Sequence, residues 1–212
     1  MKANKEDLTI LLEALSRQRV EKIIAFSGGS ECNGSAEVLA EESLALLKDY
    51  RIAIVNGGTA WGLSKYTTQS ARRLGIPVIG VYPTRGERYA IKDLDFALEV
   101  EPRFGDSEWG DATEIFSKLV HGAEVIEGGL CTAVEFAYLM KVNVGRISHN
   151  QEPVYVVPIM SESNPRLNTV ANMAHLFPIK KEVAVACMPD FEVYNGRAAA
   201  EYLVRKLKLS RR

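Results

Sequence analysis

The chain has 212 residues, 47% of them hydrophobic and 25% charged, and its formal net charge is -1. This length predicts one domain over residues 1–212, large enough to fold without a metal or a disulfide. The charge balance argues against nucleic acid as a partner, the three scattered cysteines argue against a zinc site, and no apolar run reaches the roughly 20 residues that span a membrane. We therefore expect a cytoplasmic protein.

Short apolar runs alternate with helical patterns along the chain. A first helix is predicted over residues 5–16, where leucines recur on one helix face. Runs bounded by glycine, proline or asparagine predict buried strands at Lys22–Phe26, Ile52–Val55, Pro77–Val81, Phe96–Val100, Ala123–Ile126, Val154–Val157 and Glu182–Ala186. Helical spacing lies between most of these runs, at Ser35–Leu47, Leu63–Leu74, about 107–121, about 132–143 and Gly196–Leu207. The alternation predicts an α/β fold, a doubly wound, mostly parallel, Rossmann-like sheet of about seven strands with helices on both faces.

Three of the predicted strands end in turns that contain a pair of glycines. The residues of these turns that we expect to bind phosphate are Ser27, Gly28, Gly29, Ser30, Gly57, Gly58, Thr59, Gly62, Gly128, Gly129, Leu130, Cys131 and Thr132. The carboxyl ends of parallel strands meet at one edge of a sheet, and helix starts present unpaired amides there. None of the turns is G-x-G-x-x-G or carries a P-loop lysine, which argues against the usual NAD enzymes and P-loop triphosphatases.

Two of these turns resemble the signatures of a known superfamily. GGTAWGLSKYTTQSARRLGIPVIGVYP, from Gly57, and EGGLCTAVEF, from Glu127, resemble the two glycine motifs of the lysine-decarboxylase-like (Lonely Guy) phosphoribohydrolases. The wider superfamily of Rossmann-type nucleotide-binding proteins includes the DNA-processing protein and the molybdenum-cofactor carrier proteins. The resemblance covers Lys22 to Met140, and it departs from the pattern at Glu127, usually Pro or Gly, and at Cys131, usually Gly. The cysteine either narrows the pocket or packs as a small apolar residue.

The resemblance implies a catalytic carboxylate at Glu135. In the phosphoribohydrolases this glutamate acts on the N-glycosidic bond together with an arginine upstream of the second glycine pair. The corresponding stretch of this chain, Asp111–Thr113, holds no basic residue. Glu135 can still stabilise the positive charge that develops on the sugar and position a water molecule. Arg85 and Arg88 are the best substitutes for the missing cation, or else they are exposed loop charges.

Further candidate contacts lie outside the signatures. Trp109, among acidic residues, either stacks on a base or belongs to the start of a helix. Trp61 either covers the pocket or packs between helices. Asn164 and Arg166 follow a predicted strand end and could reach the rim of the pocket.

Three functions stay open. The first is a carrier or sensor that binds a nucleotide or a nucleotide-like cofactor through its phosphate, with no other cofactor and no metal. The second is a phosphoribohydrolase that cleaves nucleoside 5′-monophosphates, and the third is a DNA-associated module. We expect a small-molecule nucleotide as the ligand, and self-association as a dimer or tetramer.

Overall fold

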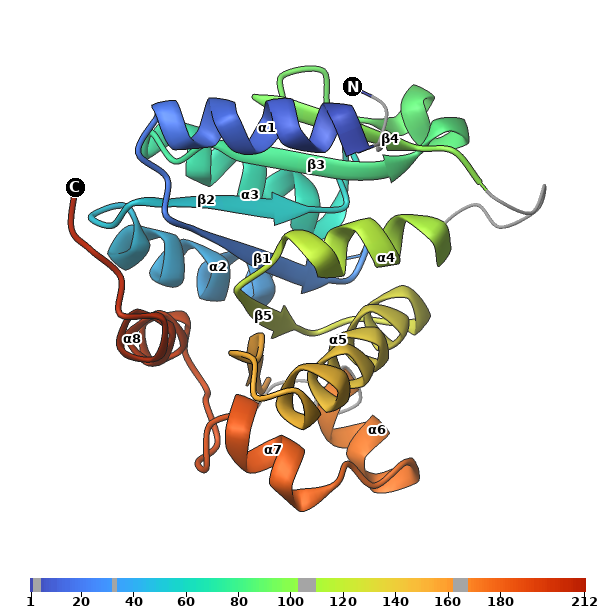
Figure 1. The fold of residues 1–212 in the computed structure, drawn as a ribbon, viewed down its shortest axis with the longest axis vertical. Coiled ribbons are helices and arrows are strands. Elements are labelled where there is room, and N and C mark those ends of the chain that lie inside the picture. The colour runs from blue at the N-terminus through green and yellow to red at the C-terminus, as the bar shows by residue number, and fades with distance from the viewer. Residues whose placement is uncertain (2–4, 32–33, 103–109, 162–167) are drawn as a thin grey trace.

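One sheet of six parallel strands, in the order β4-β3-β2-β1-β5-β6, organises the fold (Figure 1). The computed structural model describes residues 1, 5–31, 34–102, 110–161 and 168–212. The strands are β1 (Lys22–Gly28), β2 (Ile52–Asn56), β3 (Val78–Pro83), β4 (Phe96–Val100), β5 (Gly122–Ile126) and β6 (Tyr155–Ile159). The chain winds outward from β1 to β4 and then returns to place β5 on the other side of β1. The direction of winding therefore reverses between β1 and β5, where ligands bind in open sheets of this kind.

Helices cover both faces of the sheet, as the alternating pattern predicts. They are α1 (Lys5–Arg17), α2 (Gly34–Leu47), α3 (Gly62–Arg73), α4 (Gly110–Leu119), α5 (Leu130–Ser148), α6 (Thr169–Leu176), α7 (Lys181–Cys187) and α8 (Gly196–Leu207), with a 3-10 helix η1 (Thr84–Tyr89) after β3.

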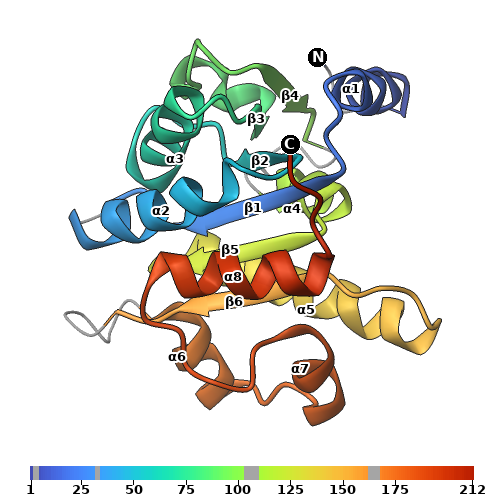
Figure 2. The same cartoon turned by 90° about the vertical axis from the view of Figure 1, so that its left-hand side faces the viewer.

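Two apolar cores lie on opposite sides of the sheet. On one side, α1, α4 and α5 pack against the strands through side chains such as Leu11, Phe116 and Phe136. On the other side, α2, α3 and α8 do so through side chains such as Leu44 and Leu203. Figure 2 shows α8 running along β5 and β6, and α6 and α7 contact α5 beyond the β6 edge. Buried on both faces, the strands have the continuous apolar runs expected of a parallel sheet.

The predicted strand at Glu182–Ala186 is wrong, because these residues lie within helix α7. The short apolar run that follows Glu182, from Val183 to Ala186, suggested a buried strand. In the structure Val183 and Cys187, four residues apart, share the buried face of the helix, and Val185 is 68% exposed. The sheet consequently has six strands instead of about seven.

Other differences concern the ends of elements. The predicted helix at about 132–143 begins at Leu130 and continues to Ser148. The short elements α6 and η1 were not predicted. Among the described residues, no helix is both long and apolar enough to span a lipid bilayer.

Candidate functional site

The three glycine turns surround a single cavity of about 360 Å³ at the carboxyl ends of β1, β2 and β5. The cavity lies at the reversal of winding between β1 and β5. Its lining residues come from all three turns and from the starts of α3 and α5: Phe26, Gly28, Gly29, Ser30, Gly57, Thr59, Trp61, Ser64, Gly129, Leu130, Cys131, Thr132 and Glu135. The prediction that the turns meet at one edge of the sheet therefore holds for this cavity.

The first turn is joined directly to the start of α3. The amide of Leu63 donates a hydrogen bond to the carbonyl oxygen of Gly29, at 3.0 Å. Gly62 makes this approach possible, because its φ is +58° and a Cβ there would lie 2.4 Å from the same carbonyl oxygen. Only glycine combines this backbone angle with such close backbone contact. The first and second turns are thus held as one unit.

The second turn is organised by Asn56, the last residue of β2. Its Oδ1 accepts a hydrogen bond from the Gly58 amide at 2.9 Å, and its Nδ2 lies 3.0 Å from the hydroxyls of Thr67 and Thr68 on α3. Asn56 is fully buried. The Gly58 amide is therefore already bonded within the protein, and the amide contribution expected from this glycine is not available to a ligand.

The third turn leads into α5 with Gly129 as its N-cap. The first amides of a helix have no partner within the helix, and they carry the positive end of its dipole. A Cβ built on Gly129 meets no atom within 4 Å, so this backbone borders open space. The Gly128 carbonyl accepts a hydrogen bond from Thr169 Oγ1, at 2.7 Å, which ties the turn to the start of α6. An anion in the cavity would face the unpaired helix amides.

The carboxyl group of Glu135 lines the cavity from the second turn of α5. The buried Ser27 hydroxyl, at the end of β1, donates a hydrogen bond to Glu135 Oε2. Burial raises the pKa of Glu135 to about 7, and the hydrogen bond from Ser27 opposes that rise. The carboxyl group is therefore partly protonated near neutral pH, and it can act as a hydrogen-bond donor or acceptor toward a ligand.

Several predicted residues lie outside the lining. Ser27 donates a hydrogen bond to Glu135, and Gly58, Gly62 and Gly128 belong to the turns without lining the cavity. Among the described residues that line the cavity, none carries a positive charge. Neither predicted substitute cation is one of these lining residues, and the guanidinium of Arg88 lies over the Tyr89 ring, 4.5 Å from its centroid. The remaining candidates Trp109, Asn164 and Arg166 fall outside the described residues.

Known structures share this fold. A molybdenum cofactor binding protein from the phototrophic bacterium Rippkaea orientalis is 16% identical, with a TM-score of 0.60 over 89% of this chain and 98% of that chain. The protein TM1055, a structural genomics target, is 13% identical, with a TM-score of 0.67 over 87% and 99%. DNA processing protein A from Streptococcus pneumoniae is 17% identical, with a TM-score of 0.52 over 86% and 65%. These likenesses, all below 20% identity, show a shared Rossmann-like α/β fold. No protein-family model and no curated protein matches the sequence.

Glu127 and Cys131 are the two positions at which the chain differs from the glycine motifs that it resembles. Glu127 has a positive φ of 38° and is buried, and one of its carboxyl oxygens accepts a hydrogen bond from Ser35 at the start of α2, at 3.1 Å. It therefore links the end of β5 to α2. Cys131 is exposed as a whole residue and lines the cavity, whereas its thiol is partly buried, and this partial burial together with the nearby Glu135 raises the pKa of the thiol. The thiol consequently stays protonated at neutral pH.

Sequence reasoning missed three contributors to the site. Phe26 and Ser64 line the cavity without belonging to a glycine pair, and Asn56 orders the second turn. Asn56 had a usable signal, since a polar side chain that ends an apolar strand just before two glycines often forms a turn with the backbone amide two residues on. Phe26 and Ser64 gave no such signal, because an apolar strand residue and a helix serine are common everywhere.

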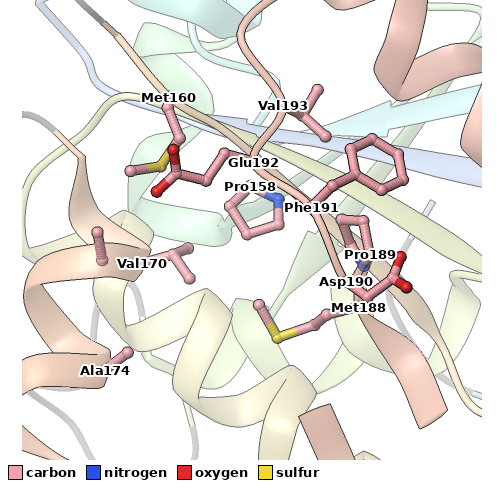
Figure 3. A pocket seen from close by; sticks show the side chains of 11 residues that line it. Pro158, Met160, Val170, Ala174, Met188, Pro189, Asp190, Phe191, Glu192 and Val193 are labelled. Atoms are coloured by element: carbon pink, nitrogen blue, oxygen red, sulfur yellow. The ribbon is translucent and has the colours of Figure 1, made fainter. Parts of the chain in front are cut away.

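A second cavity of about 360 Å³ lies near the β6 edge of the sheet, and Figure 3 shows it from close by. It shares no lining residue with the glycine-turn cavity. Its walls come from the end of β6, from α6 and from the segment at 188–193, and they include Met160, Val170 and Met188. The lining is apolar apart from the acidic Asp190 and Glu192. Such a surface disfavours phosphate, so the glycine-turn cavity is the better candidate for an anionic ligand.

Proposed function

We propose that this chain binds a phosphorylated small molecule in the glycine-turn cavity and acts as a carrier or sensor. The ligand is a nucleoside monophosphate or a nucleotide-like cofactor. The observation that carries the proposal is the convergence of three glycine turns and two helix starts on one cavity at the switch point of the sheet. Ligand sites of open α/β sheets lie at such points, and helix starts favour anions there.

Neutral groups would hold the phosphate. The hydroxyls of Ser30, Thr59, Ser64 and Thr132 line the cavity beside the backbone of Gly129. Backbone amides and hydroxyls are effective partners for phosphate oxygens in a site that excludes water. The protonated form of Glu135 would add one more donor and would remove a negative charge that repels the ligand.

Binding is favoured over cleavage because the described lining has no cation. Cleavage of an N-glycosidic bond gains from a positive charge beside the phosphate and the departing base. Loss of such a charge-assisted partner costs roughly 1.5–3 kcal/mol, or about one to two decades in rate. One fold neighbour is itself named as a cofactor binding protein, which agrees with a binding role.

Thermal unfolding with and without ligands tests the proposal. We expect AMP, GMP or CMP to raise the Tm, and the matching nucleosides to leave it unchanged. A ligand at 100 times its Kd stabilises the folded state by about 2.7 kcal/mol. Equal increases in Tm with nucleotides and nucleosides would show that the phosphate does not contribute to binding. No shift from any of them would reject binding of nucleoside monophosphates.

A phosphoribohydrolase is the second candidate, and the position of Glu135 favours it. The carboxyl group lines the cavity, is oriented by Ser27, and titrates near neutral pH. In this reaction water attacks the C1′ carbon, the bond from C1′ to the base nitrogen breaks, and the base leaves with a proton while ribose 5-phosphate forms. Release of free base from AMP by the wild type, lost in Glu135→Gln, would establish this activity. Intact AMP after long incubation would support the carrier role.

We also propose that the chain self-associates. Three large apolar side chains of the region around α6 and α7 are about two-thirds exposed: Leu176 at 69%, Phe177 at 67% and Val185 at 68%. Large exposed apolar patches mark protein interaction sites, and we propose that these side chains contribute to one. Light scattering after gel filtration would give the copy number, and Phe177→Ser should shift it toward the monomer. A wild type that is monomeric at high concentration would contradict this proposal.

A further inference from the structure

Trp61, an aromatic residue of the second glycine turn, lies at the glycine-turn cavity with Tyr89 packed beside it. Trp61 lines the cavity and is 38% exposed, and Tyr89 beside it is 37% exposed. We infer that Trp61 is a stacking surface for a planar heterocycle of the ligand, so that the site recognises a base as well as a phosphate. This inference rests on the proposed function, and it assigns a binding surface to the part of the ligand other than the phosphate, a planar heterocycle.

The position of Trp61 in the cavity lining agrees with the first of the two interpretations offered by the sequence, that it covers the pocket. Trp61 is the residue just before α3, and its ring contacts the ring of Tyr89 from the 3-10 helix η1. The two ring centroids are 5.1 Å apart, and the ring planes meet at 66°. An edge-on contact of this kind leaves ring surface free, in agreement with the exposure of both residues. An exposed indole in a cavity wall offers its π-face to a ligand.

Backbone hydrogen bonds hold the aromatic pair in place. The Ala60 amide donates to the Tyr89 carbonyl oxygen at 2.8 Å, and the Ile91 amide donates to the Gly58 carbonyl oxygen at 2.8 Å. The second glycine turn is thus fastened to the segment that follows η1. Because the backbone of this segment is already ordered, only side-chain freedom of Trp61 remains to be lost when a ligand stacks on its ring, which favours affinity.

A second apolar side chain lines the same cavity from the third turn. Leu130, the first residue of α5, is 80% exposed. The lining therefore combines exposed apolar groups, Trp61 and Leu130, with the glycine backbone and hydroxyls that suit a phosphate. A phosphate ester with an aromatic ring matches both parts. The cavity volume of about 360 Å³ lies within the range of small-molecule sites.

Isothermal titration with AMP, CMP and ribose 5-phosphate tests the inference, since only the first two carry a base. We expect AMP to bind about 5- to 100-fold more tightly than ribose 5-phosphate, with CMP between them because its ring is smaller. Trp61→Ala should abolish the difference and leave the affinity for ribose 5-phosphate unchanged. Trp61→Phe keeps an aromatic ring and should retain most of the difference. Tyr194→Ala removes an aromatic ring of similar exposure, 42%, outside the cavity, and it should leave all three affinities unchanged.

Tryptophan fluorescence gives an independent measure of stacking. The chain has two tryptophans, so replacing Trp109 leaves Trp61 as the single emitter. In a Trp109→Phe background, AMP should quench Trp61 and ribose 5-phosphate should not. Equal wild-type affinity for AMP and ribose 5-phosphate would overturn the stacking role and leave the proposed phosphate site intact. An equal loss of both affinities in Trp61→Ala would also overturn it, since Trp61 would then only support the turn. If none of the three ligands binds the wild type, the proposed function fails together with this inference.

Discussion

We expect the free energy of unfolding of this protein to fall as the pH rises, because β5 carries a buried carboxyl group. Glu124 is fully buried beneath α2, where Ser43 Oγ donates a hydrogen bond to Glu124 Oε1 at 2.6 Å. Within the described part of the chain, Glu124 Oε2 has no hydrogen-bond partner. Burial raises the pKa of this carboxyl from 4.5 to about 8, and the bond from Ser43 only partly opposes the rise. Glu124 is therefore protonated in the folded state at neutral pH.

The shift in pKa sets the size of the effect. Because the folded state holds the proton more tightly than the unfolded state, the stabilisation is fully present below the unfolded pKa of 4.5 and is lost as the pH rises to about 8. At about 1.4 kcal/mol for each pKa unit, the total loss is on the order of 5 kcal/mol. About half of it, roughly 2–3 kcal/mol, falls between pH 5 and pH 7. This is a large part of the usual stability of a folded domain.

Glu124→Gln removes the titrating group and keeps the shape of the side chain. We expect urea unfolding of wild type and variant, compared between pH 5 and pH 7, to show the variant gaining roughly 2–3 kcal/mol relative to the wild type. Other titrating groups are present in both proteins, so their contributions cancel in the difference. Glu13→Gln, on the exposed side of α1, is the matched control and should give a constant difference. Parallel stability curves for wild type and Glu124→Gln would refute the assignment of a raised pKa to Glu124.

Three further predictions concern the cavity. Gly129→Ala adds a Cβ to the backbone that borders the cavity, so calorimetry should show AMP affinity falling by about tenfold while the urea midpoint stays unchanged. In the control Gly145→Ala the added Cβ also meets no atom within 4 Å, and the affinity for AMP should not change. Gly62→Ala should lower the free energy of unfolding in urea by about 2–4 kcal/mol, because the new Cβ would lie 2.4 Å from a backbone oxygen at a φ of +58°. A variant with the wild-type urea midpoint would contradict the close contact between the first and second turns. AMP should bind more tightly as the pH falls toward about 6.5, because a bound phosphate dianion favours the protonated form of Glu135. Glu135→Gln should make AMP affinity nearly independent of pH over this range. A variant that keeps the wild-type pH dependence would exclude Glu135 as the cause of that dependence.

The sheet could be predicted from the sequence because each of its strands is a continuous apolar run, and such runs occur where both faces of a strand are covered. Helix α7 could not, because seven residues with valine at alternate positions satisfy the strand pattern as well as the helix pattern. Only the packing of Val183 and Cys187 against α5 and its neighbours decides between the two.

The position of the candidate site followed from topology, because glycine turns after parallel strands must meet at one edge. The hydrogen-bond partners of the side chains and amides in the site could not be predicted in this way. Ser27 and Glu135 are 108 residues apart in sequence, and no local pattern links them. Likewise, the Gly58 amide is bonded to Asn56, and although asparagine at that position favours such a bond, the glycine pair itself does not show which amides face the cavity. Hydrogen-bond partners within a turn depend on side-chain placement, which the motif alone leaves undetermined.

The described lining of the cavity holds no cation, which has a consequence for how ligand binding would respond to dissolved salt. Dissolved ions screen the attraction between full charges strongly, but they have little influence on short-range hydrogen bonds to amides and hydroxyls. The affinity for a phosphate ester should therefore change little between low and high ionic strength. A steep dependence on potassium chloride would instead reveal that a cationic side chain reaches the bound ligand.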